Sequence, residues 1–380
     1  MTKSRASDLS ALRIVEIGPV PILKSTFPDQ TDYFSTAMGD SPEESGRGSR
    51  SVSLGTLTHL LQALREPDVD LIACQPTFFS PWSWRSLSRV ISHRRIFRGH
   101  LSPIRWFGPQ FLRTTLNAPV AVLDYEDMPV INRNNFFLLD RCRTYFKREL
   151  PVDRWRVFLK TGHANLPTPR FRRLKRYQRR LAKLEPLSLG LPKMPSALLP
   201  AQPIPKSADV FFSGRIDDSS SIRSRGFAEL QALRHNGVAV DIADGPLPPD
   251  EYYRRCARAW LVWSPEGFGW DCFRHYEAPV CWSVPVINHP TIERYRPLIS
   301  NEHALYYDPE PGGLTRAVVW ALADKPRLAR MAEAARDHVL VHHTRSAIAR
   351  YIVGKTLGFE DSSPTWTTKL EGKRGVPQEP

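Results

Sequence analysis

Residues 264–288 combine glycines, an arginine and a carboxylate at spacings that suit the binding of a nucleoside diphosphate. Gly267 and Gly269 permit a tight turn and let backbone N–H groups approach a ligand, and a helix beginning after them directs its positive end to the same place. Arg274 and Glu277 share one face of that helix. The arginine can bind a phosphate group, and the carboxylate can accept hydrogen bonds from both hydroxyls of a ribose. A glycine turn followed by a helix with a surface ion pair explains the same spacing.

A second cationic group follows the predicted strand 209–213. It consists of Gly214 and Arg215, directly after the strand, and of Arg223, Arg225 and Gly226 at the start of the next predicted helix. Guanidinium groups offer planar, paired donors and keep their charge, so two or three of them beside a helix start suit a pyrophosphate. A solvated basic loop, its charge neutralised by Asp217 and Asp218, is the competing interpretation.

A third candidate follows the apolar run 119–123, which predicts a short strand. Asp124, Tyr125, Glu126 and Asp127 come at its carboxyl end. Parallel sheets place their ligands at the carboxyl ends of their strands, so this group is a candidate for substrate contact.

Alternating apolar patterns predict the elements that position these residues. The first half has strands predicted at 12–17, 69–73 and 119–123, a helix at 54–65, and a loop over the polar stretch 29–50. The second half has strands predicted at 209–213, 238–242, 260–263, 284–288 and 304–307, and helices at 224–235, 249–258, 271–281, 313–323, 326–342 and 344–358. Strand, helix, strand implies parallel α/β units in both halves.

Six prolines among the 22 residues of 185–206 predict a linker between two domains. We expect an N-terminal domain over 1–184, a C-terminal domain over 207–343, a terminal helix over 344–358 and a frayed tail over 359–380.

The net charge of +14 in 380 residues is regional. Residues 81–183 carry 23 Lys and Arg against 6 Asp and Glu, a local +17 that leaves −3 for the rest of the chain. Within this region, 78–113 interleaves aromatic residues with arginines, and 168–185 predicts an amphipathic helix with a cationic side. Residues 78–113 and 168–183 can be a solvated helix face with buried aromatic residues, or a surface that lies on anionic lipid. No recognition-module motif for nucleic acid is present.

Five scattered cysteines without a CxxC motif or zinc-type spacing indicate reduced thiols in a cytoplasmic protein. No run approaches the roughly 18 apolar residues of a spanning helix, and the first residues lack the apolar core of a signal peptide. No GxSxG motif supports a hydrolase, and Cys272 and Cys281 are interpreted as core residues of a helix. No metal is expected, because arginines and a helix terminus can neutralise a diphosphate.

From 207 to 357 the chain resembles the exostosin-like and spore-maturation-type glycosyltransferases of the glycosyltransferase-B fold. The resemblance lies in the stretch SPEGFGWDCFRHYEAPVCWSVPVIN (264–288), in HALYYDPEPGGL (303–314), and in Ser213-Gly214-Arg215 with Arg225-Gly226. It implies two Rossmann-like domains facing a cleft and a nucleoside diphosphate sugar as donor substrate.

In that family the glutamate at the Glu277 position is expected to bind the ribose. The loop Glu266 to Gly269, which includes Phe268, is expected to bind the sugar or the phosphate. Gly214, Arg215, Arg225 and Arg274 would then hold the leaving diphosphate. This chain departs from the family in the ten residues between Glu266 and Glu277, more than many retaining members have, and in the arginine that replaces a lysine before Gly226.

The N-terminal half resembles the acceptor domain of the same group through DYEDMPVINRNN (124–135) and YFKREL (145–150). Asp124 or Asp127 would orient an acceptor hydroxyl or act as base, and Lys147 or Arg148 would meet negative charge. Alternatively, Asp127 caps the next segment, and Lys147 and Arg148 belong to a solvated helix face.

The sequence therefore predicts a glycosyltransferase acting on a hydroxyl of a glycan, lipid or protein. A nucleotide-sugar epimerase on the same fold, or a non-catalytic basic protein that binds anionic lipid or polyanions, are the alternatives.

Overall fold

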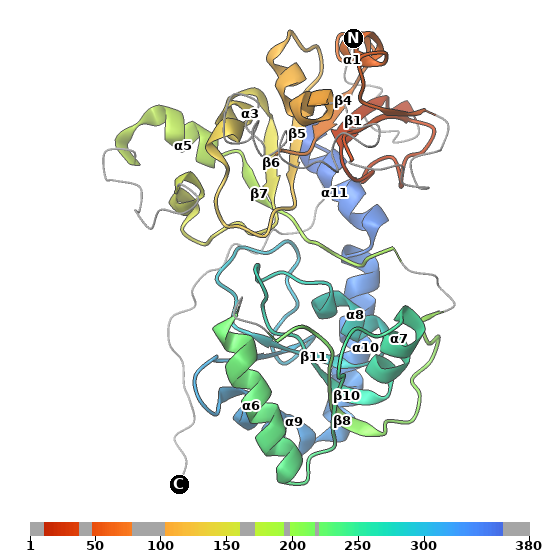
Figure 1. Cartoon of the computed structure of the whole chain (residues 1–380), viewed down its shortest axis with the longest axis vertical. Helices are drawn as coiled ribbons and strands as arrows, with labels where there is room; N and C mark the ends of the chain where they lie inside the picture. The colour runs from red at the N-terminus through yellow and green to blue at the C-terminus, as the bar shows by residue number, and fades with distance from the viewer. Residues whose placement is uncertain are drawn as a thin grey trace.

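A computed structural model describes residues 11–37, 48–77, 103–159, 172–193, 198–216 and 220–359. Two parallel sheets, each flanked by helices, form two lobes, one above the other in Figure 1. The α/β class predicted from the sequence is confirmed.

The first lobe contains a sheet in the order β3-β2-β1-β4-β5-β6-β7, with every described pairing parallel. Its strands are β1 (Ile14–Gly18), β2 (Thr31–Ser35), β3 (Ser49–Ser51), β4 (Leu71–Cys74), β5 (Val120–Asp124), β6 (Thr144–Lys147) and β7 (Leu184–Pro186). The helices beside it are α1 (Leu57–Ala63), α3 (Phe136–Arg141) and α5 (Lys175–Leu181), with 3-10 turns at Pro103–Arg113, Arg133–Asn135 and Arg154–Phe158.

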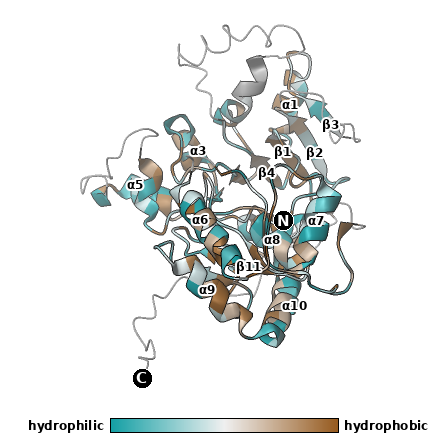
Figure 2. Cartoon of the chain, turned by 60° about the horizontal axis from the view of Figure 1, so that its bottom comes forward, coloured by the Kyte–Doolittle hydropathy of each residue, from teal (hydrophilic) through white to brown (hydrophobic). Residues whose placement is uncertain are grey.

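Successive residues of each central strand enter opposite cores. Val15 and Ile17 pack in a cluster with α1 and α3, whereas Ile14 packs in a cluster with the last helix, α11 (Arg345–Leu357). Because helices cover both faces, β1, β4, β5 and β6 are buried along their whole length, unlike the alternating strands of one-sided sheets. In Figure 2 the inner strands β1 and β4 are hydrophobic, and α5 and α7 are largely hydrophilic.

The second lobe contains a parallel sheet in the order β12-β11-β10-β8-β9. Its strands are β8 (Ala208–Phe212), β9 (Val240–Ile242), β10 (Ala259–Trp263), β11 (Val284–Asn288) and β12 (Leu305–Tyr307). Its helices are α6 (Ser221–His235), α7 (Pro249–Ala257), α8 (Arg274–Val280), α9 (Gly313–Leu322) and α10 (Lys325–His342). Every element predicted for this half is present, with bounds that shift by up to three residues.

The prediction of a loop over 29–50 is wrong where the structure describes it. Thr31–Ser35 is strand β2, paired with β1, and its aromatic residues Tyr33 and Phe34 are buried. The sequence did not reveal this strand, because its other buried residues, Thr31 and Ser35, are polar and only the two aromatic residues are apolar.

The predicted amphipathic helix 168–185 is also shorter than expected. Residues up to 171 lie outside the described part, Leu174 is extended and 44% exposed, and α5 ends at Leu181. Leu184–Pro186 is strand β7, so the first sheet includes the start of the proline-rich stretch.

The two lobes are connected by direct contacts as well as by the chain. Pro151 and Ile292 form an antiparallel bridge, and Glu293 N donates to Leu150 O at 2.7 Å. The guanidinium of Arg154 donates to both carboxylate oxygens of Glu293. Helix α10 belongs to the second lobe and α11 to the first, so the chain crosses back near its end (Figure 1).

Candidate functional site

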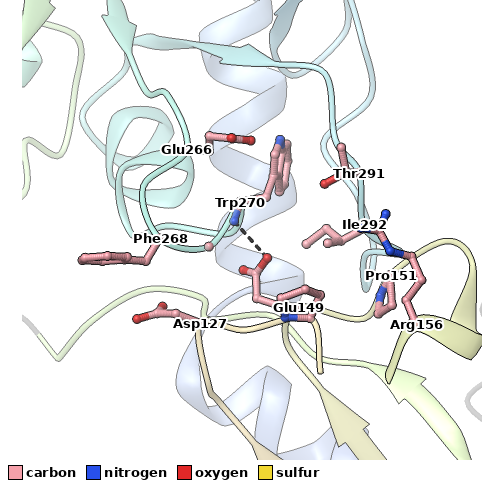
Figure 3. A pocket seen from close by; sticks show the side chains of 11 residues that line it. Asp127, Glu149, Pro151, Arg156, Glu266, Phe268, Trp270, Thr291 and Ile292 are labelled. Carbon is pink, nitrogen blue, oxygen red and sulfur yellow. Dashed lines mark hydrogen bonds between the residues drawn. The ribbon is translucent and has the colours of Figure 1, made fainter. Parts of the chain in front are cut away.

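The loops that follow β6 and β10 meet between the sheets. Glu149, two residues beyond β6, accepts hydrogen bonds from the backbone N–H groups of Trp270 (2.9 Å) and Asp271 (3.0 Å), as Figure 3 shows for Trp270. Both loops begin at carboxyl ends of parallel strands, the edge at which such sheets bind ligands. The carboxyl edges of the two sheets therefore border one space.

A pocket of about 140 Å³ lies at this junction. Its charged lining consists of the carboxylates Asp127, Glu149 and Glu266 and the guanidinium of Arg156. Its other lining residues are Pro129, Pro151, Phe268, Gly269, Trp270, Thr291 and Ile292 (Figure 3). Phe268 is 71% exposed at its rim, an apolar ring beside carboxylates. Such a lining can hydrogen-bond hydroxyl groups and pack against the apolar face of a sugar.

The loop after β10 is fixed at both ends. Glu266 N donates to Asn288 Oδ1, and Asn288 Nδ2 donates to Glu266 Oε2, both at 2.9 Å. A Cβ atom at Gly269 would lie 2.5 Å from Glu149 Oε1, so only glycine lets the loop approach the first lobe this closely. From the sequence, these glycines are expected to let backbone N–H groups approach a ligand, and that role stays a prediction, whereas Gly269 lets the loop approach Glu149 of the first lobe.

Two guanidinium groups lie against glycines at the ends of β8 and β10. Arg223 Nε donates to the backbone oxygen of Glu266 at 2.8 Å, and Arg274 Nη1 donates to that of Ser213 at 3.1 Å. A Cβ atom at Gly267 would lie 2.5 Å from Arg223 Nη2, and one at Gly214 would lie 2.9 Å from Arg274 Nη1. The glycine turns thus make room for two cations beside exposed backbone.

Arg215 and Arg225, the other two predicted clamp residues, are exposed. The backbone oxygen of Arg215 accepts a hydrogen bond from Arg223 Nη1, while Arg225 Nε donates to the backbone oxygen of Ser221 one turn earlier in α6. Asp217 and Asp218, offered as neutralising partners, lie outside the described residues.

Glu277 lies in α8 and is buried. Its two carboxylate oxygens accept hydrogen bonds from the hydroxyls of Tyr252 and Tyr253 in α7, each at 2.9 Å. Burial raises the pKa of Glu277, and the two tyrosine hydrogen bonds oppose that shift. Each oxygen keeps a further lone pair that can accept from a ligand hydroxyl. Glu277 is not among the lining residues of the pocket between the lobes.

Three carboxylates at the carboxyl end of β5 have different environments. Asp124 is buried, accepts from Tyr145 Oη at 2.8 Å and lies 3.2 Å from Lys147 Nζ, which identifies a structural pair. Asp127 is exposed and pairs with Arg148 at the edge of the pocket. Burial and the charge of Asp124 raise the pKa of Glu126 to about 7.

Lys147 and Arg148 are not a solvated helix face. Lys147 lies in β6 and is buried against Asp124, and Arg148 is buried with its guanidinium against Asp127. Both contacts are ion pairs within the protein, so a role of either cation in binding a substrate stays a prediction.

Cys281 is buried, as the interpretation of a core thiol requires, but Cys272 is not a helix residue. It precedes α8, is half-buried and contacts Ser264 and His275. Among the described His, Cys, Asp and Glu side chains, no group of three could hold a metal ion. Within the same ranges, every helix is too short or too polar to span a bilayer.

No family model matches the chain, and no curated protein matches its sequence. Solved structures do resemble it. A glycosyltransferase from Rickettsia africae superposes with a TM-score of 0.53 at 9% identity, over 92% of this chain and 99% of that one. HepE of Anabaena, in complex with UDP, superposes with a TM-score of 0.51 at 12% identity, over 90% of this chain and 99% of that one. Sucrose-phosphate synthase of Thermosynechococcus elongatus superposes with a TM-score of 0.50 at 14% identity, over 90% of this chain and 97% of that one.

These likenesses confirm the predicted fold: the chain has the two-lobed glycosyltransferase-B architecture. They do not distinguish an exostosin-like or spore-maturation subtype, which stays a prediction.

Sequence reasoning did not single out Glu149, Arg156 or Trp270. Glu149 had a usable signal, because a carboxylate within two residues of a parallel strand's carboxyl end faces the ligand edge. Arg156 and Trp270 had none, because only the contact between lobes brings them together.

Proposed function

We propose that the protein is a glycosyltransferase that uses a nucleoside diphosphate sugar as donor and a hydroxyl group as acceptor. One observation carries the proposal: the guanidinium groups of Arg223 and Arg274 lie on glycine turns at the carboxyl ends of β8 and β10. This arrangement, on a glycosyltransferase-B fold, offers paired donors and backbone N–H groups to a diphosphate.

In this proposal Arg223 and Arg274 stabilise the charge that develops on the leaving diphosphate, which is the largest expected contribution to catalysis. Arg215 and Arg225 supply further positive charge from the exposed side. Glu277, held by hydrogen bonds from two tyrosines, accepts hydrogen bonds from the ribose hydroxyls. The donor sugar, a hexose or a related sugar, enters the pocket bordered by Glu266 and Phe268.

The acceptor hydroxyl enters the same pocket from the first lobe. Asp127 lines it, and Glu126 lies in the same loop with a pKa near neutrality. We propose one of these two carboxylates as the group that orients or deprotonates the acceptor, whether a glycan, a lipid or a protein. Glu126 is the better base at neutral pH because a base works best when its pKa is near the working pH.

The test is a screen of UDP, GDP and ADP sugars for release of free nucleotide diphosphate, with and without glycan and lipid acceptors. HepE was solved with UDP, so UDP-sugars come first. Arg223→Gln and Arg274→Gln should each lower turnover by about 10²- to 10³-fold. Arg234→Gln, on the exposed side of the same helix as Arg223, is the matched control.

Turnover that is unchanged in both variants would overturn the proposed clamp. Donor consumption that needs no acceptor and yields an isomerised sugar would identify an epimerase instead. Because two guanidinium groups neutralise the diphosphate in this proposal, turnover should persist in the presence of EDTA. A loss of activity that a divalent cation restores would contradict neutralisation by the arginines alone.

A further inference from the structure

A cysteine, a serine and a histidine meet beneath the loop that follows β10. Cys272 Sγ lies 3.3 Å from Ser264 Oγ and 3.6 Å from His275 Nδ1, and Ser264 Oγ lies 2.7 Å from the same nitrogen. Ser264 and His275 are buried, whereas Cys272 is half-buried. None of the three has a role in the proposed transfer reaction.

The orientation of the histidine follows from its other nitrogen. His275 Nε2 lies 2.9 Å from the backbone oxygen of Trp270, which can only accept a hydrogen bond. Nε2 therefore carries the hydrogen, and in the neutral ring Nδ1 is an acceptor that faces Ser264 and Cys272. This is the arrangement of a nucleophile, a base and a group that orients the base.

The three side chains form a continuous path for one proton. In the neutral state the thiol donates to Ser264 Oγ, and that hydroxyl donates to His275 Nδ1. When both hydrogens shift along the chain, Cys272 becomes a thiolate that accepts from Ser264, and His275 becomes an imidazolium that donates to Ser264. Neither state leaves one of these three polar groups unpaired.

The charges around Cys272 favour the ionised state. Burial by itself would raise the pKa of this thiol, but the positive charges of His275 and Arg274 and the hydrogen bonds from His275 and Ser264 lower it to about 6. Glu277 is the carboxylate that faces the thiolate and opposes this effect, and Asp271 acts on His275.

The remaining cysteines are in different surroundings. Burial raises the pKa of Cys74, Cys142 and Cys256, and Cys281 is also buried. Because the thiolate is the reactive form, the chain contains one thiol set apart by its neighbours.

We propose that Cys272 is a reactive thiolate and a modification site for soft electrophiles, hydrogen peroxide among them. The thiolate sulfur attacks one peroxide oxygen, an S–O bond forms and the O–O bond breaks. The departing hydroxide takes a proton from the His275 imidazolium to give water. The sulfur is oxidised to a sulfenic acid, and the peroxide is reduced.

The modified sulfur would adjoin Arg274, which is two residues away and acts on Cys272 through its charge. Under the proposed function, an oxygen or an alkyl group at this position disturbs the diphosphate clamp from below. Modification of Cys272 should therefore weaken donor binding.

Alkylation of the folded protein with iodoacetamide, followed by peptide mass spectrometry across pH 5 to 9, tests the reactivity itself. We expect Cys272 to react at least tenfold faster than the other four cysteines, with a midpoint near pH 6. His275→Gln should move that midpoint above about 8, the range of an ordinary thiol. His289→Gln, an exposed histidine of the same lobe, should leave it unchanged.

Equal labelling of all cysteines, or a wild-type midpoint above 8, would overturn the proposal. If His275→Gln does not fold, Ser264→Ala serves in its place, because it interrupts the same path and should also raise the midpoint.

A second experiment treats the protein with hydrogen peroxide and measures the thermal shift caused by UDP. The shift should fall and return with a thiol reductant in the wild type, but stay constant in Cys272→Ser. A constant shift in the peroxide-treated wild type would overturn the link to the donor site. The absence of any UDP shift before treatment would count against the proposed function, and the labelling result would still decide the reactivity of Cys272.

Discussion

Arg274 and Glu277 lie on the same helix and have different partners. Arg274 extends toward the end of β8, where its Nη1 meets the backbone of Ser213. Glu277 points toward α7, where two tyrosine hydroxyls hold it. A nucleotide bound across α8 would therefore present its diphosphate to one residue and its ribose to the other, and the two contributions can be separated.

Glu277→Gln should weaken UDP binding about tenfold while leaving inorganic pyrophosphate binding unchanged, because pyrophosphate has no ribose. Arg274→Gln should weaken both ligands, since hydrogen bonds to charged groups are worth about 1.5–3 kcal/mol. Isothermal titration calorimetry with the two ligands measures the difference. Equal losses for both ligands in Glu277→Gln would remove the ribose assignment.

Gly269 occupies a position where a side chain has no room. Gly269→Ala should destabilise the protein by about 1–3 kcal/mol, the usual cost of overpacking, because its Cβ would meet the Glu149 carboxylate. Gly245→Ala is the control, since nothing lies within 4 Å of a Cβ atom there. In a Glu149→Ala background the cost of Gly269→Ala should fall, with the remainder due to Arg148 Nη2, which would lie 2.8 Å from the same Cβ atom. Thermal unfolding of the four variants checks this. Full additivity of the two changes would contradict the described contact.

At the scale of the element, the turn after β1 depends on one buried carboxylate. Glu16 lies in β1 and accepts hydrogen bonds from the backbone N–H groups of Ile22 (2.7 Å), Leu23 (3.2 Å) and Lys24 (2.8 Å). Burial raises the pKa of Glu16 to about 7, against the opposing effect of these N–H groups. The turn is thus held by a group that titrates near neutrality.

The contribution of Glu16 to stability should decline as the pH rises. Between its ordinary pKa near 4.5 and its folded value near 7, the unfolded chain has lost a proton that the folded chain keeps. The difference in free energy of unfolding between the wild type and Glu16→Gln should therefore be largest at or below pH 4.5 and shrink up to pH 7. Urea unfolding at several pH values measures it, and a difference that grows with pH would be contradictory.

The sequence predicted elements well where apolar periodicity was strong. Every strand and helix of the second lobe was predicted, because its strands are apolar runs and its helices have apolar residues at helical spacing. The prediction failed at β2, where only two of the buried residues are apolar, and at the helix 168–185, whose apolar spacing continued across the extended Leu174. Periodicity does not show where a chain leaves a helix to join a sheet.

The sequence identified candidate site residues by their type, but it did not predict which side chains contact the loop after β10. Arg215 and Arg225 match the expected pattern in the chain, yet Arg223 is the residue of that group whose side chain contacts the loop after β10. Spacing places a residue on a helix, whereas its contacts depend on elements far away in the sequence.

At the scale of the whole molecule, the last helix connects the lobes. Ile352 of α11 is fully buried against the first sheet, although α10, directly before α11, packs in the second lobe. Ile352→Ala should lower the free energy of unfolding by about 2–5 kcal/mol through the cavity it leaves. Val341→Ala, at an exposed site of α10, should have little effect in the same denaturation experiment. Equal effects would show that α11 does not stabilise the first lobe.

The basic region supports one further prediction about the whole chain. Arg173, Lys175 and Arg179 of the described part are exposed, whereas Arg176 and Arg180 pair with Asp140. We propose that this face meets anionic lipid, so the protein should float with phosphatidylglycerol vesicles at 0.1 M salt and not at 0.5 M. Changing the three exposed cations to glutamine should weaken flotation, and equal binding to neutral vesicles would contradict an electrostatic surface.

We propose that Arg223 and Arg274 hold the diphosphate of the donor. A crystal structure of the protein with UDP tests it most directly. We expect phosphate oxygens within about 3 Å of both guanidinium groups, beside Gly214 and Gly267, and the ribose near Glu277. A diphosphate bound elsewhere, with Arg223 still donating to the backbone oxygen of Glu266 and Arg274 to that of Ser213, would contradict it.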